Sequence, residues 1–88
     1  MLRGIILGQV SPAEEGVTMV EVVMVIAPRI FRDEEYTEPK RVLESRGAHV
    51  VTASVAPGEC IGKLGLHAVA ELSVTEATQM AWDAVIFV

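Results

Sequence analysis

The stretch EVVMVIAPRIFRDEEYTEPKRVLESRG, from Glu21 to Gly47, decides the fold because it has the pattern of a strand, a loop and a helix. Residues 22–26 form an almost unbroken β-branched run, which is typical of a strand buried on both faces of a parallel sheet. Residues 27–32 make a short loop around Pro28. We therefore expect a parallel sheet whose first strand is followed directly by a covering helix.

The helix is predicted to begin at the acidic cluster of residues 33–35 and to end at Gly47, a common C-terminal stop. Negative side chains are stabilising near the N-terminus of a helix dipole, and positive ones near its C-terminus. The basic residues that are expected to complement the C-terminal end are Lys40, Arg41 and Arg46.

Pro39 disturbs this helix, because an interior proline removes a backbone donor and crowds the carbonyl of Glu35, four residues earlier. The helix is therefore expected either to kink at Pro39 or to start later. Residues 34–38 would form a tight, partly irregular turn in both cases. The side chains expected to pack on the sheet are Tyr36, Val42 and Leu43.

The segments that follow predict further strands. Residues 49–54, HVVTAS, form a second short strand, which the helix connects to the first in a βαβ unit. Residues 55–65 are rich in Pro and Gly and predict a loop. Residues 66–72 alternate weakly and predict a small hairpin or edge ribbon.

A last apolar run, residues 84–88, predicts a third parallel strand buried on both faces, and Ser73 or Thr75 can cap a short helical turn over residues 76–80 before it. An unpaired strand edge invites association, and one helix cannot cover both faces of a parallel sheet. We therefore expect self-association or a complementary C-terminal half as the partner.

Composition limits the class of protein. The chain has 88 residues, half of them apolar, which makes one small domain at most. Its net charge of -5 and the lack of a basic stripe argue against nucleic acid as a partner, and no apolar run approaches the ~18 residues of a membrane span. Cys60 is the only cysteine, so no intrachain disulfide can form and a cytoplasmic location is expected.

The first 18 residues do not resemble the rest. We expect residues 1–18 to be a leader that is either disordered or a weak extra strand at residues 4–10, and residues 19–88 to form the domain. The apolar part of the leader is short, broken by glycine and without a small-x-small cleavage site, so it does not predict a signal peptide.

Glu35 is a candidate ligand-site residue, because it lies at the start of the helix near the C-terminal end of the first strand, where open α/β sheets place their ligand sites. A surface carboxylate that stabilises the helix dipole is the alternative explanation.

The other motifs are weak. Cys60 lies in a Gly/Pro-rich stretch without a neighbouring base or helix start to activate it, which predicts a structural or incidental thiol. Gly58, Gly62 and Lys63 imitate a phosphate loop, but the spacing is one residue short and no helix obviously follows. The two histidines, His49 and His67, have no zinc spacing, so neither a metal nor a cofactor is predicted.

The run VMVIAPRIFRDEEYTEPKRVLESRGAHVVTASVAPGECIGKLG, with LHAVAELSV and WDAVIFV after it, resembles the N-terminal half of the ThiJ/PfpI family, which includes PfpI-type intracellular proteases or amidases and parkinsonism-associated deglycases. The resemblance covers residues 19–88. It implies half of a flavodoxin-like, class I glutamine amidotransferase-like three-layer α/β sandwich with a parallel sheet.

The resemblance also implies a chemistry. Members of this family use a cysteine on a strand-to-helix elbow, assisted by a glutamate from the first strand-helix turn, and Glu35 matches that glutamate by its spacing to Pro39 and Gly47. The elbow cysteine would lie beyond Val88. We therefore expect a fragment of a cysteine-dependent hydrolase or deglycase that is inactive alone; the alternative is a non-catalytic binding or regulatory module that completes its sheet by oligomerisation.

Overall fold

A parallel sheet forms the centre of the computed structural model, which describes residues 20–88. The central strand, β1 (Glu21–Val25), pairs in parallel with β3 (His49–Ser54) on one side and with β7 (Ala84–Phe87) on the other. A short strand, β6 (Leu72–Ser73), extends the sheet beyond β3 in the order β6-β3-β1-β7. The prediction of an α/β fold with a parallel sheet is confirmed, and the predicted leader lies outside the described residues.

A second, three-stranded sheet contains β2 (Arg29–Phe31), β4 (Gly58–Gly62) and β5 (His67–Ala70) in the order β2-β4-β5. The predicted loop over residues 55–65 is wrong in its middle, because β4 pairs antiparallel with β5 and buries Cys60 at its centre. Residues 66–72 do not form a hairpin by themselves; their strand β5 is the edge strand of this sheet and forms a hairpin with β4. Local Gly and Pro content predicted a loop here, but cross-strand pairing decided the structure.

The helix α2 (Asp33–Ser45) runs for 13 residues with Pro39 inside it. The predicted later start and the irregular turn at its beginning are therefore wrong. Proline removes only the donor that would bond to the carbonyl of Glu35, and packing of Tyr36 and Leu43 against the sheet holds the remaining turns in place.

The N-terminal end of α2 agrees with the predicted charges, whereas the C-terminal end does not. The first turn is acidic, as predicted, and the chain leaves the helix through Gly47 at φ 90°. The last turn, however, has no basic residue. The pairs Lys40–Glu44 and Arg41–Glu38, each with an N···O distance of 2.8 Å, run along the helix surface instead.

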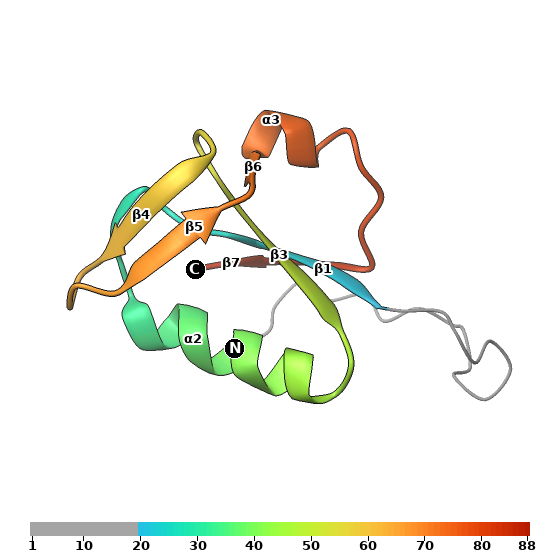
Figure 1. Cartoon of the computed structure of the whole chain (residues 1–88). Coiled ribbons are helices and arrows are strands. Elements are labelled where there is room, and N and C mark those ends of the chain that lie inside the picture. Colours follow the sequence, from blue (N-terminus) through green and yellow to red (C-terminus); the bar gives the residue numbers. More distant parts are fainter. Residues whose placement is uncertain (1–19) are drawn as a thin grey trace, which may run out of the picture.

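The four-stranded sheet lies between α2 and a short helix, α3 (Val74–Ala77), on its other face (Figure 1). Val22, Met24 and other side chains pack on the α2 side, whereas Val23 packs with Ala77 on the α3 side. Alternate residues of β1 therefore serve both faces, as expected for a β-branched run. Within residues 20–88, no helix combines the length and apolar character needed to cross a membrane.

Ser73 caps α3, as one of the two predicted alternatives. Its side chain accepts a hydrogen bond from the Glu76 backbone N–H at 3.0 Å, and the Glu76 carboxylate accepts from the Ser73 N–H at 2.9 Å, which completes a capping box. The helix itself begins two residues earlier than the turn predicted over residues 76–80, because the capping residue is Ser73 rather than Thr75.

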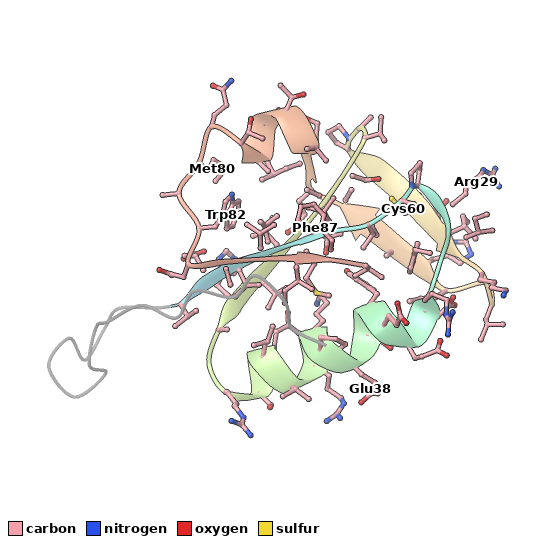
Figure 2. The ribbon with its side chains drawn as sticks, turned by 180° about the vertical axis from the view of Figure 1, so that it is seen from behind. Arg29, Glu38, Cys60, Met80, Trp82 and Phe87 are labelled. Carbon is pink, nitrogen blue, oxygen red and sulfur yellow. The ribbon has the colours of Figure 1, made fainter. Side chains whose placement is uncertain are left out.

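β7 is parallel to β1, as predicted, but it is not buried on both faces. Ala84 and Ile86 are buried on the α2 side, whereas Val85 is half-buried and Phe87 is 75% exposed. The described residues place no strand on the outer edge of β7. Figure 2 shows Phe87 and Trp82 on the face that α3 covers only in part.

Ile30 has an unusual backbone conformation in the segment between β1 and α2. Its φ is 54°, which for a β-branched residue is a steric outlier. The pairing between β2 and β4 explains why, because Arg29 pairs with Ile61 and Phe31 with Gly62, which leaves Ile30 as an extra residue in β2. Its side chain is 76% exposed, so burial offsets little of the strain.

Replacing Ile30 with glycine is expected to stabilise the chain. Glycine removes a left-handed penalty of about 1–2 kcal/mol and adds a smaller entropy cost, so the free energy of unfolding should rise by about 1 kcal/mol. Urea unfolding measures this change. Ile30→Ala keeps the Cβ atom and the strain, and should change stability by less than about 0.5 kcal/mol. Equal effects of both variants would contradict a strained backbone at Ile30.

Candidate active site

Glu35 lies in the first turn of α2, which follows β1 after the short strand β2. Its side chain is exposed. The backbone leading to it is held at the carboxyl edge of the sheet, because the Ile26 N–H donates to the Ala53 carbonyl at 2.9 Å and the Ser54 hydroxyl donates to the Ile26 carbonyl at 2.7 Å. The structure thus places Glu35 at the edge where open α/β sheets carry ligand sites.

The neighbour of Glu35, Tyr36, fixes the rotation of the helix. Tyr36 is buried, and its hydroxyl lies 2.7 Å from Thr52 Oγ1 on β3. Its ring also packs edge-on against Phe31, with centroids 5.6 Å apart and planes at 71°. With Tyr36 held towards the sheet, Glu35 lies about 100° around the helix and points away from the core.

Because Tyr36 fixes how α2 is rotated about its axis, Glu35 lies on the flank of the helix that faces β7. Thr37 and Glu44 line a groove against β3 and β5, and Glu35 is on the opposite flank of the helix. Val42, seven residues after Glu35, shares this flank and is 36% exposed, so the prediction that Val42 packs on the sheet is wrong. Glu35 and Val42 therefore face the side on which the edge of β7 is free.

Asp33 joins the start of α2 to the turn between β4 and β5. Its two carboxylate oxygens accept hydrogen bonds from the backbone N–H groups of Leu64 and Leu66, at 3.0 and 2.9 Å. Gly62 lies under this carboxylate, since a Cβ atom at that position would be 2.6 Å from the Asp33 Cγ. The turn, the glycine and the first residue of α2 therefore form one rigid unit two residues before Glu35.

The same hydrogen bonds affect the ionisation of Asp33. The Leu64 N–H, with a smaller contribution from the Leu66 N–H, holds the pKa of the Asp33 carboxyl below its usual value of 3.8. The residue therefore stays charged at neutral pH and across the mildly acidic range.

A groove of about 990 Å³ lies between α2, β3 and β5, on the other side of the helix from Glu35. His49 on β3 and His67 on β5 both line it. Each ring contacts a glutamate of a neighbouring strand: His49 Nδ1 lies 2.7 Å from Glu21, and His67 Nδ1 contacts Glu59. Within residues 20–88, no three metal-binding side chains gather at one point.

Cys60 is a buried core residue, 1% exposed, which agrees with the predicted structural thiol. Its Sγ contacts the Gly58 carbonyl at 3.8 Å, and no helix starts beside it. The phosphate-loop interpretation fails for the same reason, because Gly58 and Gly62 belong to a strand that leads into a turn rather than a helix.

The family model and the solved structure that this chain resembles belong to the same family. The model of the DJ-1/PfpI family matches residues 20–88. The crystal structure of a ThiJ/PfpI domain protein from Brachyspira murdochii superposes with a TM-score of 0.73 at 32% identity, over 80% of this chain and 41% of that one. An uncharacterized protein of Methanocaldococcus jannaschii is 39% identical over 74 residues, which is 84% of this chain and 36% of that protein. The chain thus spans less than half the length of either relative.

Two residues of this region were not identified from the sequence. Asp33 was interpreted only as part of an acidic helix start, although a small residue at Gly62 was a signal for a close approach. Ile30 gave no signal, because its left-handed backbone arises from pairing between strands far apart in the sequence. Glu35 was identified, and its role stays a prediction.

The hydrogen bonds from the Leu64 and Leu66 N–H groups to the Asp33 carboxylate are expected to stabilise the fold less in acid. Because the pKa is lowered in the folded chain, its stabilisation is present above the ordinary value near 3.8 and is lost as the pH falls through the lowered value. Asp33→Asn should therefore lower the urea midpoint at pH 7, and its difference from the wild type should shrink as the pH falls below 3.8. Glu34→Gln is the exposed neighbouring control and should change the midpoint less at pH 7. A deficit of Asp33→Asn that does not shrink below pH 3.8 would show that the charge is not responsible.

Proposed function

Because the chain belongs to the DJ-1/PfpI family, we propose that it supplies the glutamate-bearing half of a cysteine-dependent hydrolase or deglycase site. The observation that supports this proposal is the position of Glu35, in the first turn of α2, at the carboxyl edge of the sheet and on the flank towards the free edge of β7. The proposed setting is the cytoplasm, where a single unpaired cysteine stays reduced.

Glu35 has a defined role in this proposal. In the assembled site its carboxyl group carries the proton and donates a hydrogen bond to the thiolate sulfur of a cysteine that the C-terminal part of the whole protein provides. That bond orients the sulfur and favours its thiolate, which is the nucleophilic form. The thiolate then attacks an electrophilic carbonyl of the substrate. Tyr36 and Asp33 hold the helix start in place, so Glu35 needs little reorganisation to make this contact.

The 88-residue chain alone is proposed to be inactive. Its one cysteine, Cys60, is buried in the core and cannot meet a substrate. In this proposal the carboxyl group of Glu35 orients the sulfur and does not itself form the covalent bond to the substrate.

The test joins residues 20–88 to the C-terminal remainder of a relative that carries a cysteine at a strand-to-helix turn. Glu35→Gln should raise the pKa of that cysteine, measured as the pH profile of its alkylation by iodoacetamide, and lower turnover by about 100-fold. Glu34→Gln, which changes the same charge one residue away, should leave the profile near that of the parent. An unchanged profile in Glu35→Gln would remove Glu35 from the mechanism.

A second candidate function rests on β7. Its outer edge is free among the described strands, and Phe87 exposes 75% of its surface there. Such an edge is a template for pairing with another strand. In this alternative the chain is a non-catalytic binding or regulatory module, and two copies pair through β7 to complete the sheet.

Oligomeric state separates the two functions. The module predicts a discrete dimer of the 88-residue chain in sedimentation equilibrium, which Phe87→Lys converts to monomer by placing charge at the paired edge. Val69→Lys, an exposed position of β5, should leave the dimer intact. A monomeric or polydisperse wild-type chain would rule out the module.

A further inference from the structure

The outer edge of β3 offers main-chain groups to the groove between α2, β3 and β5. The His49 N–H donates to the Val20 carbonyl at 2.8 Å, so the main-chain groups of His49 point towards β1. Because these groups alternate in direction along a strand, those of Val50 and Thr52 point away from β1. Among residues 20–88, Thr52 has hydrogen-bond partners on that side and Val50 has none. Both residues line the groove.

Glu71 marks the point at which this edge becomes covered. Its N–H donates to the Thr52 carbonyl at 2.9 Å, and its carboxylate accepts a hydrogen bond from the Thr52 N–H at 3.0 Å. The strand after Glu71, β6, continues along β3, whereas the strand before it, β5, turns away to pair with β4. The edge of β3 is therefore covered from Thr52 onwards and open at Val50.

β5 presents a second free edge to the same groove. The Gly62 N–H donates to the Leu66 carbonyl at 2.8 Å, so Leu66 and every second residue after it direct their main-chain groups towards β4. Those of His67 and Val69 point the other way and have no partner among residues 20–88, and both residues line the groove. β3 and β5 meet near β6 and separate towards α2 (Figure 1). The groove is thus bordered by two strand edges with free donors and acceptors.

The charged side chains that line this groove already have partners. Lys40 contacts Glu44 and Arg41 contacts Glu38, each with an N···O distance of 2.8 Å. The carboxylate of Glu71 accepts a hydrogen bond from a main-chain N–H, and the two histidines each contact a glutamate. A charged ligand would therefore have no free opposite charge to meet, whereas an uncharged ligand matches the groove.

The size and lining of the groove suit a short peptide. Its volume of about 990 Å³ is at the upper end of the range of small-ligand sites. The hydroxyl groups of Tyr36 and Thr52, which line it, are buried and bonded to each other, and Leu66 and Ala68 add apolar surface. The strand edges therefore supply main-chain donors and acceptors with which a ligand can pair. Peptides that add to a strand edge bind through such groups.

We propose that this groove binds a short, uncharged peptide, whose main-chain N–H and C=O groups pair with the free edges of β3 and β5. The partner is thus an uncharged, extended segment of another protein. Such a segment presents donors and acceptors alternately at the spacing of a strand. The groove is on the flank of α2 opposite Glu35, so peptide binding needs neither that residue nor the nucleophile of the proposed reaction.

The experiment follows the amide signals of the ¹⁵N-labelled 88-residue chain during titration with acetyl-Thr-Val-Thr-Val-Thr-amide. We expect saturable shifts centred on Val50, His67 and Val69. Two N-methylated forms, one methylated at both valines and one at all threonines, each lack the donors of one side of the extended peptide. At least one of them should bind about tenfold more weakly. Equal binding of the parent and both methylated peptides would overturn the inference.

Val69→Pro is the decisive variant, because proline removes the N–H that faces the groove and leaves the bonds between β4 and β5 in place. It should weaken binding of the parent peptide about fivefold or more. Val69→Thr is the matched control, since it keeps the N–H and should bind the peptide as the unchanged chain does. Equal affinities of the two variants would contradict pairing with the edge of β5.

The class of peptide and the place of binding are tested with the unchanged chain. Acetyl-Thr-Glu-Thr-Glu-Thr-amide should bind about fivefold or more weakly than the uncharged peptide, because its carboxylates lose water without gaining a partner. Equal or tighter binding of this acidic peptide would overturn the uncharged class. Shifts centred on β7, or no saturable shifts at all, would overturn the assignment of the groove.

Discussion

The buried contact between Tyr36 and Thr52 is the constraint on which the candidate site depends. It joins α2 to β3 through two hydroxyl groups 2.7 Å apart, in a core where an unpaired hydroxyl would be costly. This contact permits one rotation of the helix, because Tyr36 must point to the sheet. Glu35 is then turned to the flank facing β7, and Thr37 to the flank facing β5. The direction of the candidate catalytic carboxylate is thus a consequence of core packing.

A second set of contacts fixes the helix start along its axis. The carboxylate of Asp33 holds the turn between β4 and β5, and Gly62 leaves room for that carboxylate. The three-stranded sheet is thereby joined to the start of α2, the helix that carries Glu35. The same unit holds the exposed Leu64 and adjoins the strained Ile30.

The asymmetry of the sheet agrees with the share of the family fold that this chain covers. The chain spans 41% of a Brachyspira murdochii relative of similar fold, and its described strands leave one edge of β7 unpaired. Glu35 and Val42 face the same side as that edge. A catalytic glutamate at this position requires a nucleophile from outside the described residues, since Cys60 is a core residue.

The sequence by itself determined the central strands, the acidic start and glycine stop of the covering helix, and the candidate glutamate. These features follow from local patterns: β-branched runs, an acidic start before Tyr36, and a glycine stop. Tertiary structure alone decided the continuity of α2 through Pro39, the strand containing Cys60 and the left-handed backbone of Ile30. Each of these depends on pairing or packing between segments distant along the chain, which override local propensity because burial and cross-strand hydrogen bonds contribute more free energy.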